Sequence, residues 1–447
     1  MTETSRLIDA YPFRDLVLEA AAHAAVQGCQ RDYQGYLHHC VMGLEAAWQI
    51  GEFMPSNRNR LLPFVQMLWY AVGEARAPEI DIKKWIGTPP AEEKLSMEAF
   101  VEAVEQRHFE QAYRQLVFLL RLPGMRNRIF LFLFRKALAD EAGLAHKLIY
   151  LVKTFQFLDA MKWQKYEYLC LPVLHYLMKA EPRTETFERV EAFFNQHRSA
   201  LSGAKIDQQN NLTTSFYSEL KESVFADERD VTLEKMMGWM TDSDSRSMIL
   251  EGLRLAANEL VYESDPQKVI YPLHAFHYAA CLSSVFHRLE PEDQMRALGM
   301  AALMVKNISA LSQPLTKPVI IPLGTIDQKN NPLYFVEHGI EHGDAGRALG
   351  ALAYILDHEA PSGQLFEALA FLASKNLYSV LYAHDIKLAV ACLTSYQQTT
   401  HPLRGQYLKT LVKVLAQQPK EHTITNSLVN TQKIKRGYFT VPGSFNF

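Results

Sequence analysis

Residues 144–161 read LAHKLIYLVKTFQFLDAM, and the spacing of their apolar side chains decides the fold class. Leu148, Leu151, Val152 and Phe155 stand at positions i, i+3, i+4 and i+7, so a helix would carry them on one face. We therefore predict an α-helix here. The same spacing recurs along the chain, for example in FRDLVLEAAAHAAV (13–26), FEQAYRQLVFLLRL (109–122), RIFLFLFRKAL (128–138) and QLFEALAFLA (364–373).

The alternating pattern of β-strands is scarce. Only KPVIIPLGTI (317–326) and GYFTVPGSF (437–445) have an extended pattern, and the Pro and Gly in both suit loops. Breaks between helical segments fall at 87–94, 202–211 and 312–332. We therefore predict an all-α fold built from helix pairs.

Two halves of the chain repeat one another in outline. LHHCVMGLEAAW begins at Leu37, and LHAFHYAACLSS begins 236 positions later at Leu273. Two further blocks keep this offset, and AHKLIYLV at Ala145 meets AHDIKLAV at Ala383 with an offset of 238. We predict two duplicated halves, residues 1–230 and 231–447, related by pseudo-two-fold symmetry within one compact globule. The alternative is a chance overlay, because amphipathic helices resemble one another.

Histidines coincide in this overlay. His38 pairs with His274, and His146 pairs with His384; the separations within the halves are 108 and 110 residues. A pseudo-two-fold repeat with two inward histidines per half would bring four imidazoles together. Neutral imidazole is a common ligand for iron, copper, zinc, nickel or manganese, and a set without cysteine suits a redox metal with an open position. The alternative is four core histidines bonded to carbonyls or carboxylates.

Other histidines have no such partner. His39 and His277 lie next to the matched residues, or one turn away, and would support the ligands or face a substrate. In EHGIEHGD, His338 and His342 have the i, i+4 spacing of helical ligands. The glycines beside them favour the start of a helix with solvated histidines over a metal site.

Composition limits the functional classes. The net charge of −3 and pI of about 6.6 argue against a nucleic-acid binder or an anionic-membrane binder. The basic cluster Arg126, Arg128, Arg135 and Lys136 is typical of a solvated helix face. Five scattered cysteines without Cys-x-x-Cys indicate a reducing compartment. No segment has the length and apolarity of a membrane span, and the N-terminus lacks a signal-peptide pattern. We therefore expect a soluble cytoplasmic protein.

Several of these helices resemble those of a known family. YLHHCVMGLEAAWQIG (36–51) resembles the N-terminal histidine helix of the questin oxidase-like proteins. AHKLIYLVKTFQFLDAM, YPLHAFHYAACLSSVF and GDAGRALGALAYIL are similar to that family's later helices. The resemblance spans most of the chain.

The resemblance implies a mononuclear non-haem iron oxygenase on an all-helical scaffold, with O2 as co-substrate and aromatic polyketides as substrates. Its metal ligands would be His38, His146, His274 and His384. It also implies a carboxylated lysine as a further ligand, for which Lys306, Lys375 and Lys387 are candidates.

The main hypothesis is an Fe(II)-dependent oxidoreductase that acts on an apolar or aromatic small molecule, with the metal held between the halves; another transition metal would also fit. The alternative is a metal-free helical-repeat scaffold that binds a partner protein.

Overall fold

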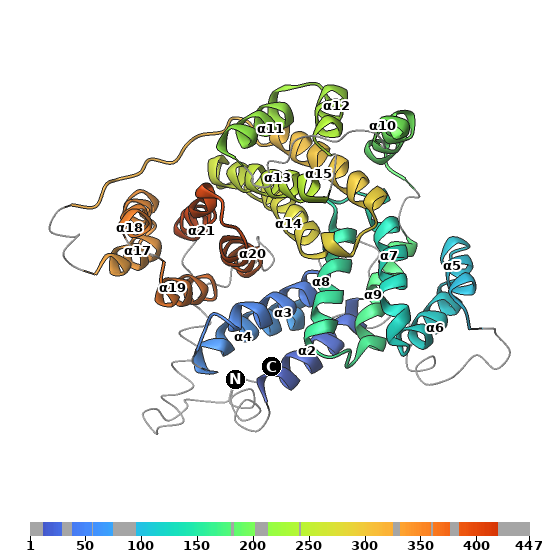
Figure 1. Ribbon diagram of the computed structural model, residues 1–447. Helices are drawn as coiled ribbons and strands as arrows, with labels where there is room; N and C mark the ends of the chain where they lie inside the picture. The colour runs from blue at the N-terminus through green and yellow to red at the C-terminus, as the bar shows by residue number, and fades with distance from the viewer. Residues whose placement is uncertain are drawn as a thin grey trace, which may run out of the picture.

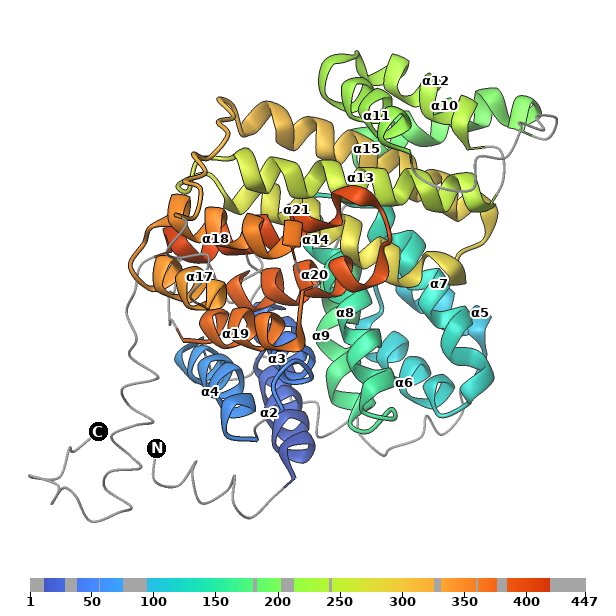
Figure 2. The same ribbon diagram turned by 60° about the vertical axis from the view of Figure 1, so that its left-hand side comes forward.

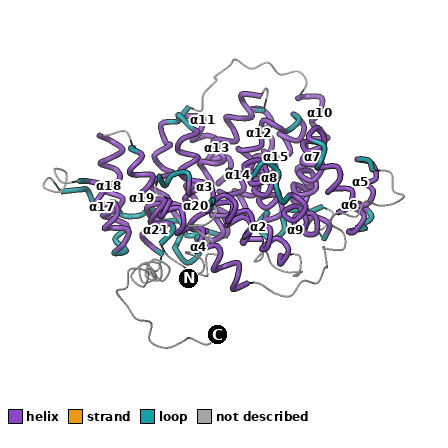
Figure 3. The backbone as a smooth tube through the Cα atoms, turned by 90° about the horizontal axis from the view of Figure 1, so that it is seen from below, coloured by secondary structure: helices purple, strands orange, loops and turns teal. Residues whose placement is uncertain are grey.

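The predicted helices are present in the computed structural model. Its described residues form nineteen α-helices and two short 3-10 helices, and they contain no strand (Figure 3). The prediction of an all-α fold is therefore confirmed. The described residues are 12–28, 38–55, 57–74, 95–179, 183–201, 213–240, 243–324, 331–358, 361–375 and 384–418.

The first eight helices lie in the N-terminal part of the chain. They are α2 (Phe13–Gly28), α3 (His38–Gly51), α4 (Asn57–Glu74), α5 (Met97–Glu105), α6 (Phe109–Leu120), α7 (Pro123–Ala139), α8 (His146–Ala160) and α9 (Tyr166–Met178).

Three helices follow and pack beside the long helices of the C-terminal part (Figure 1). They are α10 (Glu185–Leu201), α11 (Thr214–Ala226) and α12 (Arg229–Trp239).

The C-terminal part contains eight further α-helices and two 3-10 helices, η2 (Phe286–Arg288) and η4 (Pro402–Arg404). The α-helices are α13 (Ser243–Glu263), α14 (Ile270–Val285), α15 (Pro291–Leu311), α17 (Pro332–Glu341), α18 (Ala345–His358), α19 (Gly363–Ala373), α20 (His384–Gln398) and α21 (Gly405–Gln417).

The two sets of eight helices make corresponding contacts. In the first set α2 packs on α3, α4 and α9, and in the second set α13 packs on α14, α15 and α21. In the same way, α5 packs on α6 as α17 packs on α18, and α8 packs on α7 and α9 as α20 packs on α19 and α21. Many of the contacts therefore correspond along the two sets, although α17 also packs on α19 and α21 and α6 also packs on α7.

Four helices form a closed ring at the centre of the molecule. α3 contacts α8, α8 contacts α14, α14 contacts α20, and α20 contacts α3 (Figures 1 and 2). These four helices are rich in buried residues on more than one face, because other helices cover them on the outside. Buried side chains from α2 through α21 join into one hydrophobic cluster around the ring.

The segments between helices agree with the sequence where they are described. Residues 313–324 form neither helix nor strand, as their Pro and Gly predict. The segments at 87–94, 202–211 and 437–445 lie outside the described residues. Among the helices that are described, none combines the length and the apolarity needed to cross a membrane.

An ion pair fastens α7 to α15, across the two sets of helices. Nε of Arg135 donates to both carboxylate oxygens of Asp293, at 3.1 and 2.9 Å, and a terminal nitrogen lies 2.8 Å from Oδ2. Asp293 is buried, whereas more than half of the Arg135 side chain is exposed. Arg135 is thus the partner that satisfies a buried charge.

We predict that Arg135→Ala lowers the free energy of unfolding by about 1–3 kcal/mol, because it leaves the Asp293 carboxylate buried with its main partner removed. Arg128→Ala, on the same helix and exposed, is the matched control and should change stability by less than about 0.5 kcal/mol. Urea unfolding measures both. Equal stabilities of the two variants would contradict the role of the pair.

Candidate metal centre

Four buried imidazoles meet where the four central helices come together. The helices α3, α8, α14 and α20 contribute one ring each, in the order His39, His146, His274 and His384. Nε2 of His146 lies 2.8 Å from Nε2 of His39 and 3.1 Å from Nε2 of His274. The His384 ring centroid lies 4.9 Å from that of His274 and 5.0 Å from that of His39. We call these four residues the histidine cluster.

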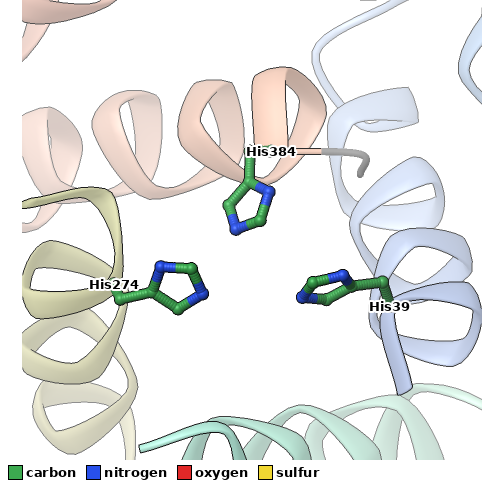
Figure 4. A group of neighbouring side chains, drawn as sticks. All are labelled: His39, His274 and His384. Atoms are coloured by element: carbon green, nitrogen blue, oxygen red, sulfur yellow. The ribbon is translucent and has the colours of Figure 1, made fainter. Parts of the chain in front are cut away.

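The cluster has the spacing of metal ligands. Figure 4 shows the rings of His39, His274 and His384 pointing toward one another from three helices. One nitrogen from each of these rings lies within 4.8 Å of the other two. Imidazole nitrogens bind a metal at about 2.1 Å, so two ligands at right angles lie about 3.0 Å apart. The separations of 2.8 and 3.1 Å around His146 match that value.

Local backbone structure orients the His146 ring. Gly143, Leu144 and Ala145 all have positive φ angles, of 67°, 62° and 57°. This left-handed turn ends where α8 begins, so His146 is the first residue of the helix. The turn also brings the carbonyl of Gly143 to Nδ1 of His146, which donates to it. Left-handed conformations are unfavourable for Leu and Ala, and such conformations are concentrated at functional sites.

The two hydrogen bonds to backbone carbonyls determine where the protons are. Nδ1 of His146 donates to Gly143, and Nδ1 of His274 donates to the carbonyl of Ile270 at 2.6 Å. A neutral imidazole carries one proton, so Nε2 of both rings is an acceptor with a lone pair, and Nε2 of His39, 2.8 Å from Nε2 of His146, is placed to donate to that atom. These two lone pairs face each other across 3.1 Å. A cation between them would remove the repulsion, and it would be a proton or a metal ion.

Burial disfavours the proton. It lowers the pKa of His39 and His274 well below the usual value of 6.5, and the nearby cation Lys387 lowers both further. Burial lowers the pKa of His146 to about 4, although its hydrogen bond to Gly143 acts in the opposite direction. These imidazoles are therefore neutral near pH 7, and neutral imidazole with its remote N–H donated to a carbonyl is the usual form of a metal ligand.

A second layer of residues lies one helical turn beyond the cluster. His277 follows His274 by three residues, and Lys387 follows His384 by three. The His277 ring stacks on that of His384, with centroids 5.7 Å apart and planes at 22°. Both His277 and Lys387 line a cavity of about 360 Å³. The histidine cluster thus lies beside a space of small-molecule size.

The three lysines that are candidates for the carboxylated lysine lie in different parts of the structure. Lys387 is buried beside the histidines, and burial lowers its pKa to about 7. Lys375 instead pairs with Glu341, and Lys306 donates to the backbone carbonyls of Val224 and Asp227. Lys387 is therefore the only one of these three that lies at the site.

The structure brings together three of the four histidines predicted as ligands: His146, His274 and His384. The fourth imidazole belongs to His39, the neighbour of the predicted His38. We predicted His39 to stand beside the ligands, and its ring lies within the histidine cluster; one residue turns a helix by about 100°, so adjacent histidines point in different directions. The side chain of His38 lies outside the described residues, so its role stays a prediction. His277 lies beside the cluster, where sequence reasoning put it.

His338 and His342 are not at the start of a helix, and this prediction was wrong. His338 lies in the last turn of α17 and His342 caps its C-terminus. Gly343 follows with a φ of 75°, so the glycine that suggested a frayed start is a left-handed residue that ends the helix. Both rings lie at the surface, with centroids 3.9 Å apart.

The comparisons with known proteins give no relative. No family model, no curated protein and no solved structure matches the chain. Any proposal about function must therefore rest on the geometry of the site.

We predict that Gly143→Ala lowers the free energy of unfolding by about 1 kcal/mol, since an L side chain is strained at its φ of 67° although there is space for the methyl group. Gly124→Ala is the control: Gly124 lies in α7 with open space around it, and alanine favours helix. Thermal unfolding should show opposite signs for the two variants. A Gly143→Ala protein as stable as the wild type would contradict the strained turn.

We predict that Lys387→Met is more stable than the wild type below pH 7, and that the difference shrinks between pH 7 and pH 10.5. In that range the unfolded chain holds the lysine proton that the folded chain has released, so wild-type stability rises with pH by up to about 1.4 kcal/mol per unit. Urea unfolding of metal-free protein at several pH values measures this. A difference that does not change with pH would contradict the lowered pKa.

Proposed function

We propose that this protein is a metal-dependent oxidoreductase that holds one transition-metal ion, Fe(II) as the first candidate, in the histidine cluster. One observation carries the proposal: the Nε2 lone pairs of His146 and His274 face each other across 3.1 Å while both Nδ1 protons are committed to carbonyls. A divalent cation satisfies both lone pairs without charging a buried imidazole. The all-nitrogen donor set suits iron, copper, zinc, nickel or manganese.

When bound, iron would supply a redox-active centre for O2-dependent oxidation. The protein's own residues would prepare the site for it. The carbonyls of Gly143 and Ile270 fix two rings with Nε2 directed inward, and burial keeps the rings neutral and excludes water. The cavity that starts at His277 would hold an apolar or aromatic substrate beside the metal.

We further propose that the chain arose by duplication of an eight-helix unit, with the metal on the pseudo-two-fold axis. The corresponding contacts within α2–α9 and within α13–α21 support this. So does the place of two ligands: His146 and His384 are the first residues of α8 and α20, and both helices are 15 residues long. Each half would then supply two imidazoles to one site.

The same account includes a cytoplasmic location. Its support is the state of the cysteines: Cys170, Cys281 and Cys392 are buried and free, which suits a reducing compartment.

The test is elemental analysis of untagged protein after anaerobic incubation with Fe(II) and removal of excess metal. We expect about one iron per chain, and at least a tenfold loss of bound iron in His146→Ala and His274→Ala, because each variant removes one of the two facing lone pairs. His342→Ala is the control, since it changes the other close pair of histidines, at the surface.

Retention of iron in both cluster variants would contradict the proposal. A protein that binds neither iron nor another first-row metal would favour the alternative, a helical scaffold that binds a partner protein.

A further inference from the structure

The cavity beside the histidine cluster is built by the same helices. Most residues three, seven or ten positions after a cluster histidine line this cavity. On α8 these are Ile149, Lys153 and Gln156, and all three line the cavity. The equivalent lining residues are Ala46 and Gln49 on α3, His277, Cys281 and Ser284 on α14, and Lys387, Ala391 and Thr394 on α20.

Positive charge dominates the buried wall of this cavity. Lys153, Lys387 and Arg254 of α13 all line it, and Lys153 alone has a carboxylate partner there, the buried Glu45 at 3.4 Å. Arg254 donates to neutral oxygens of Tyr407, Ser283 and Gln398. The acidic side chain in the lining, Glu52, is exposed.

Lys387 has no carboxylate partner among the described residues. Burial lowers its pKa most, the cation Lys153 lowers it further, and the side chain of Cys281 acts in the opposite direction. Its side chain is 7% exposed, and that remaining exposure faces the cavity. A buried lysine without a counter-ion is unfavourable, so an anion that enters the cavity would relieve its desolvation.

The rest of the lining is mainly apolar by surface, beside the neutral polar side chains of Gln49, Gln156, Ser284, Thr394, Ser395 and Gln398. Trp48 and Phe53 supply aromatic surface, and Ile149, Val390 and three alanines supply aliphatic surface. His277 adds one polar atom, because its Nε2 is buried without a hydrogen-bond partner among the described residues. A ligand that matches this wall has an apolar body and one anionic group.

We propose that the substrate class of this site is the small apolar carboxylates, with the carboxylate paired to Lys387 and the apolar body against Trp48 and Phe53. This names the substrate of the proposed oxidoreductase and so rests on that function. The anionic group would end on the same side as His277, one turn from the metal ligands His274 and His384.

The test is calorimetric titration of metal-free protein with 2-naphthoate and with 2-naphthamide, its neutral analogue. We expect 2-naphthoate to bind the wild type at least tenfold more tightly than 2-naphthamide does. Lys387→Met should remove this preference, because methionine keeps the length of the side chain and loses its charge. Lys413→Met is the matched control: Lys413 is a second buried lysine, with Nζ bonded to the carbonyl of Ser264 outside the cavity.

A third variant, Ala391→Phe, fills the cavity and should abolish binding of both compounds. Thermal unfolding of each variant shows that it is folded. Equal affinity of the wild type for the two compounds would overturn the proposal, as would tight binding of 2-naphthoate to Lys387→Met or to Ala391→Phe. Because no metal is present, failure of the histidine cluster to bind iron leaves this outcome unchanged, and the two proposals fail separately.

Discussion

The arrangement of the central helices depends on the close approach of two nitrogen atoms, Nε2 of His146 and Nε2 of His274. His146 and His274 come from helices on opposite sides of the chain's midpoint, and each is locked by a backbone carbonyl so that Nε2 faces its counterpart. Repulsion between these atoms would separate α8 from α14, yet the two helices are packed together within one continuous core. A bound cation would remove this repulsion, and burial disfavours a proton in that place. The ring of four helices, the left-handed turn before α8 and the low pKa values of the rings all serve the same arrangement.

The charges around the cluster favour anionic ligands over cationic ones. A divalent ion held by these neutral imidazoles would leave a buried positive charge, and Lys387 and Arg254 would add to it within the neighbouring cavity. Glu45 is committed to Lys153. Low-dielectric surroundings strengthen every such interaction, so an incoming anion would be attracted strongly and an incoming cation excluded. The histidine cluster and the cavity thus lie side by side, and the apolar part of a ligand would contact the apolar residues of the lining.

Much of this could be predicted from the sequence. The apolar spacing from Leu148 to Phe155 is enough to assign α8, and the matched blocks pair His146 with His384, which are the first residues of α8 and α20. That His39 belongs to the cluster could not be predicted, for a specific reason. Two adjacent histidines begin α3, and apolar neighbours on both faces of a buried helix give no sign of which one points inward. Counting three, seven and ten residues from His39 reaches Met42, Ala46 and Gln49, and the last two line the cavity. This spacing identifies the lining residues of α3 only once it is known which of the two histidines points inward.

Other features could not be derived from the sequence. Lys387 and Arg254 lie 133 residues apart, and only the packing of α13 against the central ring brings both to one cavity. The left-handed turn of Leu144 and Ala145 has no glycine at either position, so local propensity argues against it. X-ray absorption spectroscopy of the iron-loaded protein tests the central claim most directly. The account predicts nitrogen ligands at about 2.1 Å with the multiple-scattering signature of about four imidazoles. A spectrum of oxygen ligands without imidazole scattering would contradict it.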